Sequence, residues 1–128
     1  MRRTHLLIAL PLLCPLSGCL IAAAAGTAFG IIKYDNNEAI QDFEAPVGRV
    51  WKAAIGALEG RGYEVPAGTS PNIAESEDTA VIDGDGYWLK VEEQVGGRTR
   101  VRVRVGTFES EEHKRKAGLL LESIEGRL

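Results

Sequence analysis

Apolar and polar residues alternate along two stretches near the end of the chain, a pattern that is typical of β-strands. Tyr87–Glu92 and Thr99–Val105 carry apolar or small residues at one parity and charged or aromatic residues at the other. Side chains two residues apart lie on the same face of a strand, so each stretch has one face for a core and one for solvent. The sequence therefore predicts a pair of antiparallel strands with one wet face.

Two other segments repeat apolar residues at helical spacing. The first follows Pro46 and stops before a Gly-Arg-Gly stretch, and the second follows Ser110, whose hydroxyl is suited to cap a helix. The apolar stripe of the first segment consists of Val47, Val50, Trp51, Ala54, Ile55 and Leu58. The stripe of the second consists of His113, Ala117, Leu120, Leu121, Ile124 and Leu128. Both segments are predicted to be amphipathic helices that pack their stripes on a sheet.

Three weaker stretches complete the set of predicted strands. They are Glu38–Ala45, Tyr63–Pro66 and Ile73–Ile82, which alternate only roughly. Asp83–Gly86 reads Asp-Gly-Asp-Gly, a strong hairpin signal because glycine after aspartate suits the positive φ of a tight turn. The order β-α-β-β-β-β-α predicts an α+β fold, with an antiparallel sheet of about four to five strands and two helices packed on one face.

The alternation also predicts how the last two strands pair. A two-residue turn at Gly96-Gly97 would mix the two faces of the pair, so a three-residue loop or a glycine bulge is expected there. Such a loop sets like faces opposite each other: Val91 opposite Val101 or Val103, and Glu92 opposite Arg100 or Arg102.

That register gathers a row of basic residues and one aromatic residue on the wet face. The possible binding face consists of Trp88, Lys90, Arg100, Arg102 and Arg104. It is a candidate site for lipid headgroups, for a glycan or for the carboxylates of an envelope protein. The alternative is a solvated face whose charge is balanced by Glu92 and by Glu75 or Glu77.

The start of the chain has the features of an export signal. Arg2 and Arg3 precede the apolar run Leu6–Leu13. The following Leu16–Cys19 stretch reads Leu-Ser-Gly-Cys and resembles the lipobox of bacterial lipoproteins, in which the leader is cut just before an acylated cysteine. An uncleaved transmembrane helix is the alternative, because Leu6–Ile32 is almost uninterrupted apolar sequence.

The resemblance to a lipobox implies cleavage between Gly18 and Cys19 and lipidation of Cys19. The expected organisation is a signal peptide over residues 1–18, a lipidated cysteine with an Ala/Gly-rich tether over residues 19–37, and one α+β domain over residues 38–128. Small residues four apart in the tether alternatively indicate a helix that self-associates or inserts at the membrane interface.

Composition narrows the classes of function further. The 128-residue chain has a formal charge of −3, and removal of Arg2 and Arg3 with the leader makes it −5. An acidic balance gives no general attraction to nucleic acid. Cys14 leaves with the leader and Cys19 is used for the lipid, so no disulfide within the mature chain is expected.

No enzyme motif, cofactor site or metal site is predicted. His5 and His113 are the only histidines, which argues against a histidine-rich metal site. The Asp-Gly-Asp-Gly stretch lacks most of the ligands of a calcium loop and is better explained as a turn. A hydrolase would have only Ser76, Ser110, His113 and scattered acids to use, so we expect a protein that is not an enzyme.

Nearly the whole chain resembles the DUF3568 family of small bacterial lipoproteins, a domain of unknown function. The resemblance rests on Leu16–Cys19, the Ala/Gly tether, Ala45-Pro46, Val50–Ala53, Leu58, Gly62, Val65, Arg102–Phe108 and the final helix ending at Ile124–Leu128. The Ala-Pro, Val-Trp, Leu and Gly pattern is also similar to the entry into the first helix of helix-grip domains, including those of the outer-membrane assembly lipoprotein BamC. The family implies a periplasmic lipoprotein domain without an assigned activity.

These observations together predict a lipid-anchored protein of the cell envelope. Its acyl chains hold it at the membrane, and its sheet face or tether is expected to contact a partner. Leu20 follows the lipidated cysteine in place of the aspartate that retains such proteins in the inner membrane of enteric bacteria. The outer membrane, facing the periplasm, is therefore the expected location. The alternative function is a carrier of a small ligand or lipid, which requires an apolar cavity of a few hundred Å³.

Overall fold

The computed structural model describes residues 31–35, 37–73, 77–107 and 109–128. The predicted signal peptide, the predicted cleavage site at Gly18 and the predicted lipidation site at Cys19 lie outside the described residues, as does most of the predicted tether. So does part of the stretch predicted as a strand from Ile73 onward.

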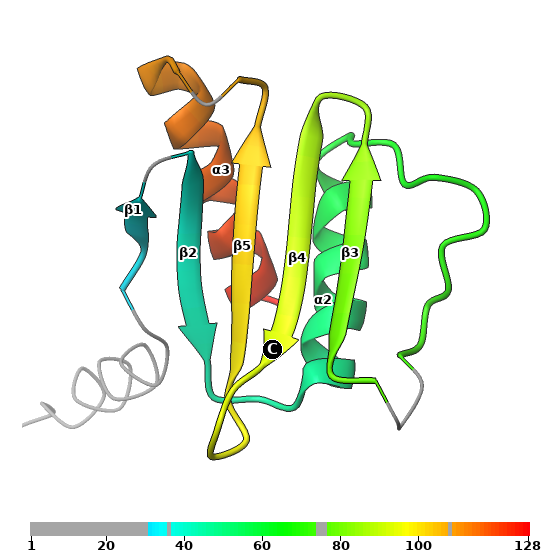
Figure 1. Ribbon diagram of the computed structural model, residues 1–128. Coiled ribbons are helices and arrows are strands. Elements are labelled where there is room, and N and C mark those ends of the chain that lie inside the picture. Colours follow the sequence, from blue (N-terminus) through cyan, green and yellow to red (C-terminus); the bar gives the residue numbers. More distant parts are fainter. Residues whose placement is uncertain (1–30, 36, 74–76, 108) are drawn as a thin grey trace, which may run out of the picture.

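An antiparallel sheet of five strands is covered on one face by two helices, which is the α+β fold that the sequence predicts (Figure 1). The strands lie in the order β1-β2-β5-β4-β3. The elements are β1 (Lys33–Asp35), β2 (Glu38–Phe43), α2 (Val47–Gly60), β3 (Thr79–Gly84), β4 (Tyr87–Glu93), β5 (Thr99–Val105) and α3 (Glu111–Glu125). Helix α3 contacts β2 and β5, and α2 contacts β4 and α3.

The pairing of β4 with β5 agrees with the predicted register. Val91 faces Val101, and Glu92 faces Arg100. The amide of Gln94 donates to the carbonyl of Arg98 at 2.7 Å and closes a three-residue loop, in which Gly96 and Gly97 have φ of 88° and 80°. Only glycine adopts two successive positive φ values at little cost, so this local sequence sets the register of the whole hairpin.

The core lies between the helices and the inner face of the sheet. Its largest fully buried apolar side chains are Phe43, Leu58, Leu89, Leu120, Leu121, Ile124, Val50, Val91, Val101 and Val103. They come from both predicted helical stripes and from the apolar positions of β2, β4 and β5. Burial of each such side chain contributes about 1.5–3 kcal/mol, so this layer supplies most of the driving force for folding.

The prediction of a strand at Tyr63–Pro66 is wrong. This segment belongs to no helix or strand, and a side chain holds its backbone, because the Tyr87 hydroxyl donates to the carbonyl of Glu64 at 2.8 Å. The rings of Tyr63 and Tyr87 meet edge to face at 5.2 Å. Burial raises the pKa of the Tyr87 phenol. An apolar-polar alternation of four residues cannot distinguish this arrangement from a true strand.

Strand β1 was not predicted from the sequence. Its three residues pair with β2, and the hydroxyl of Tyr34 lies 2.6 Å from where a Cβ on Gly118 would be. Gly118 thus marks a close approach between β1 and α3, which explains a residue that otherwise weakens a helix. The pairing with β2 is too short to leave an alternating pattern in the sequence.

We predict that Gly84→Ala destabilises the domain by about 1–3 kcal/mol, as overpacked cores typically do. A Cβ at Gly84 would lie 2.2 Å from the buried ring of Tyr87, which Tyr63 contacts edge to face and whose hydroxyl is bonded to Glu64. Urea denaturation of the full chain in mild detergent, followed by tryptophan fluorescence, measures the change. Gly48→Ala is the control, because nothing lies within 4 Å of the added methyl group in α2. Equal stability of the two variants would contradict the prediction.

Candidate functional site

The face of the sheet opposite the helices, called the open face below, brings the predicted binding residues together. Trp88 lies opposite Arg104, Lys90 opposite Arg102, and Glu92 opposite Arg100. Their side chains are all partly exposed, whereas those at the alternate positions of β4 and β5 are buried, except for Glu93 at the end of β4. The basic row therefore exists as the register predicts.

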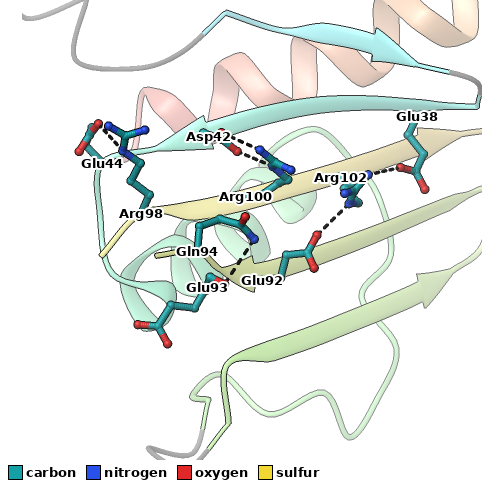
Figure 2. Close-up of polar contacts among 9 residues, drawn as sticks. All are labelled: Glu38, Asp42, Glu44, Glu92, Glu93, Gln94, Arg98, Arg100 and Arg102. Carbon is teal, nitrogen blue, oxygen red and sulfur yellow. Dashed lines mark hydrogen bonds and ion pairs between the residues drawn. The ribbon is translucent and has the colours of Figure 1, made fainter. Parts of the chain in front are cut away.

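Arg100 is neutralised within the protein by Asp42 of β2 (Figure 2). Its Nε donates to Oδ1 at 2.7 Å and its Nη2 donates to Oδ2 at 3.1 Å, a bidentate pair. The hydrogen bond from Arg100 is the main reason that the pKa of Asp42 is lowered, and the same bond raises the pKa of Arg100. Both pKa shifts favour the charged forms, so this guanidinium is engaged before any ligand arrives.

Arg102 bridges two acids from the strands on either side. Its Nε donates to Glu92 of β4 at 2.8 Å, and its Nη1 donates to Glu38 of β2 at 3.0 Å (Figure 2). The bond to Glu92 contributes most to raising the pKa of Arg102. Glu92 also lies 3.7 Å from the ammonium of Lys90. The centre of the open face is therefore a network of ion pairs across three strands.

The acids that balance the row differ in part from those expected. Glu92 takes part as predicted, but the other partners are Glu38 and Asp42, not Glu75 or Glu77. Glu77 forms no ion pair with the described residues, and Glu75 lies outside them. The difference arises because β2, and not the chain before β3, lies beside β5.

Arg104 has a different environment from the other two arginines. Its guanidinium lies 5.3 Å from the ring centre of Trp88, in cation–π geometry. Among the described residues no carboxylate forms an ion pair with Arg104. This end of the open face thus presents an aromatic surface and a cation that is not neutralised by a described acid.

Of the candidate hydrolytic residues, Ser76 lies outside the described residues, and Ser110 and His113 do not form a catalytic group with the described side chains. The hydroxyl of Ser110 accepts from the amide of His113 at 3.1 Å and caps α3. The imidazole Nδ1 of His113 lies 3.4 Å from the hydroxyl of Thr107, and the ring packs against Gly106. No described carboxylate orients this ring, which a general base would require. In the described part of the chain there is also no cluster of three metal-binding side chains.

A depression of about 330 Å³ lies on the other side of the molecule, at the amino end of α2. Gly48, Arg49, Lys52, Asn72 and Ile73 line it. It opens to solvent and carries two basic side chains, so it does not resemble the enclosed apolar cavity that a carrier of lipid would need.

Comparison with protein families agrees with the resemblance seen in the sequence. The family described as "Protein of unknown function (DUF3568)" matches residues 4–125. A comparison with curated proteins found no match. In the ranges that the structure describes, no helix has the length and apolar character needed to cross a bilayer.

We predict that Asp42→Asn lowers the free energy of unfolding at pH 7 by about 0.5–1 kcal/mol, within the range for pairs that are about a third exposed. Because the pKa of Asp42 is lowered in the folded state, its contribution is present above the ordinary carboxyl pKa of 3.8 and is lost as the pH falls through the lowered value. The two proteins should therefore approach equal stability in acid.

Denaturation of both proteins at a series of pH values from neutral to acid measures this effect. Glu44→Gln is the matched control, because Glu44 pairs with Arg98 at a site where both side chains are more than half exposed. It should change stability little at any pH. A difference between Asp42→Asn and the unchanged protein that persists unaltered in acid would contradict the assignment.

Proposed function

The chain belongs to the DUF3568 family, proteins of unknown function, and we propose that it is a lipid-anchored envelope protein that contacts a partner through its open face. It acts as a binding or accessory module and not as an enzyme. The outer membrane, on the periplasmic side, is the proposed location if the host is Gram-negative.

The anchor is proposed from the leader. Leu16–Cys19 matches the lipobox at each position, and the apolar run before it follows two arginines. Each buried methylene of an acyl chain contributes about 0.8 kcal/mol, so several chains hold the protein at the membrane without further contacts. Residues 20–32 separate Cys19 from β1, and at about 3.3–3.6 Å per residue the chain from Cys19 to Lys33 spans at most about 50 Å.

The contact surface is proposed from the environment of Arg104. Tryptophan and arginine are the side chains that most often dominate binding energy at protein interfaces. Here they lie together, partly exposed, while the neighbouring arginines are held by carboxylates. The network around Arg100 and Arg102 gives the surface a fixed geometry, and the Trp88–Arg104 pair supplies its binding contact. An acidic patch on an envelope protein fits this pair best.

The non-enzymatic role rests on the same geometry. Ser110 and His113 serve the start of α3, and the carboxylates of Asp42, Glu38 and Glu92 on the open face are bonded to arginines. Nothing among the described residues holds a nucleophile, a base and an orienting acid together.

We predict that Cys19→Ala abolishes acylation and leaves the leader uncleaved, because the thiol that carries the lipid is absent. Mass spectrometry of the protein from cell membranes gives the N-terminal residue and any attached acyl mass. Cys14→Ala is the matched control, since Cys14 leaves with the leader, and it should be processed normally. A Cys19→Ala protein that is cleaved and acylated as before would refute the anchor.

We predict that a photo-crosslinking residue in place of Lys90 captures a partner in intact cells, and that a second change, Arg104→Gln, reduces the adduct at least about fivefold. Loss of an exposed cation–π contact costs only about 0.5–1 kcal/mol, so the domain stays folded. The same crosslinker in place of Lys52, on the exposed side of α2, is the control and should not give this adduct. An adduct that survives Arg104→Gln undiminished would exclude the Trp88–Arg104 pair as the contact.

A further inference from the structure

Strand β3 forms one edge of the sheet, and no described strand pairs with its outer side (Figure 1). The opposite edge, β1, has only three residues, and short edge strands are a common protection against unwanted pairing. Strand β3 has six residues, no proline and no lysine. The chain enters the domain at β1, so the segment that leads to the proposed anchor joins the sheet at the edge opposite β3.

The register shows which backbone groups of β3 point outward. The amide of Glu93 donates to the carbonyl of Asp78 at 2.8 Å, so Asp78 and the residues of the same parity bond to β4. The amides and carbonyls of the alternate residues, Thr79, Val81 and Asp83, therefore point away from the sheet. No described residue accepts from or donates to these outward groups.

The side chains at these three positions are also exposed, on the same side of the sheet as the open face. Val81 is 48% exposed, and it is one of few large apolar side chains that the described domain leaves in solvent. Its neighbours at the same parity are a hydroxyl, Thr79, and a carboxylate, Asp83. Along this edge, Val81 lies midway between Thr79 and Asp83, and a hydroxyl and a carboxylate can bond to each other.

From this edge we infer that the protein forms a symmetric dimer, in which β3 pairs antiparallel with β3 of a second copy, with the two-fold axis at Val81. In this register Val81 faces its own counterpart, and Thr79 of each copy faces Asp83 of the other. Each of the three residue pairs exchanges two hydrogen bonds, so all the outward groups of both edges are satisfied. The two sheets join into one continuous sheet across the axis.

Other registers leave outward groups without partners. Centring the axis on Ala80 or on Ile82 retains only two of the three pairs and moves the remaining outward residue beyond the end of the partner strand. It also separates the two Val81 side chains, which lose their shared apolar contact. The Val81 register is therefore the one that a second copy of this chain fits best.

The interface is small, so the dimer is weak in solution. Beyond the strand ends, Glu77 of one copy comes near Asp85 of the other, and this like-charge pair makes association stronger at higher ionic strength. Confinement of two anchored copies to one membrane would raise their effective concentration, a point that rests on the proposed anchor. The dimer itself does not depend on lipidation or on the contact made by Trp88 and Arg104.

Hydrogen exchange measured by NMR on the full chain in detergent, at fixed detergent and rising protein concentration, tests the dimer. The amides of Thr79, Val81 and Asp83 should exchange at least about tenfold more slowly at high concentration, because only the dimer bonds them. The amides of Ala80 and Ile82 bond to β4 and should be protected at every concentration, which also verifies the fold. Exchange of the outward amides that stays fast at all concentrations, or a dimer that leaves them fast, would overturn the inference.

Val81→Glu is the variant that separates the dimer from the fold. Val81 lies opposite Lys90 on β4, so a glutamate there is attracted within one copy and repelled by its counterpart across the axis. We expect Val81→Glu to remain monomeric, and an equal mixture of Val81→Glu and Val81→Lys chains to associate again. Val95→Glu changes a residue that is 97% exposed in the β4–β5 loop and should dimerise normally. Undiminished association of Val81→Glu alone would overturn the inference, while leaving the anchor and the Trp88–Arg104 contact untouched.

Discussion

The pairing of β2 with β5 is the contact on which the rest of the structure depends. It joins segments about sixty residues apart and places β5, the last strand of the chain, at the centre of the sheet between β2 and β4. Two side chains secure it: the buried hydroxyl of Thr99 donates to the carbonyl of Ala45 at 2.7 Å, and Arg100 clasps Asp42. Without this pairing the β1–β2 pair would be separate from the rest of the sheet, α3 would lose its contact with β2, and the acids of β2 would not lie beside the basic row.

The sequence predicted those parts of the fold that local patterns determine. The two helical stripes, the β4–β5 hairpin with its glycine loop, and the basic row all follow from spacing over a few residues. The partners of the row could not be predicted in the same way, because Asp42 and Glu38 are distant in sequence and reach it only through the order of the strands. Strand β1 was not predicted, and the prediction for the segment at Tyr63 was wrong, for a related reason. A contact with the distant Gly118 holds β1, and a hydrogen bond from the distant Tyr87 holds the segment at Tyr63, so neither is marked by alternation in its own sequence.

For the candidate site, too, the sequence predicted what depends on spacing within a strand and not what depends on contacts between distant strands. Sequence spacing placed Trp88, Lys90 and the three arginines on one face, and they do lie together. It could not show that Arg100 and Arg102 are already neutralised by carboxylates. The row is therefore not a general anion-binding surface but a network of ion pairs, with Arg104 at its accessible end. Net charge would not have revealed this either, because a protein that is acidic overall still arranges its few basic groups by strand register.

The position of β1 has a mechanical consequence. The polypeptide enters the folded domain through a short strand at the sheet's edge, held by its ladder to β2 and by the packing of Tyr34 over Gly118. Tension applied along the entering segment would load those backbone bonds one after another, because the strand can peel from the side of the sheet. Strand β1 would detach from β2 before the core was disturbed, and its residues would then lengthen the segment that leads into the domain. If the proposed anchor holds the N-terminal end of the chain, this arrangement lets β1 detach under load while the core stays folded.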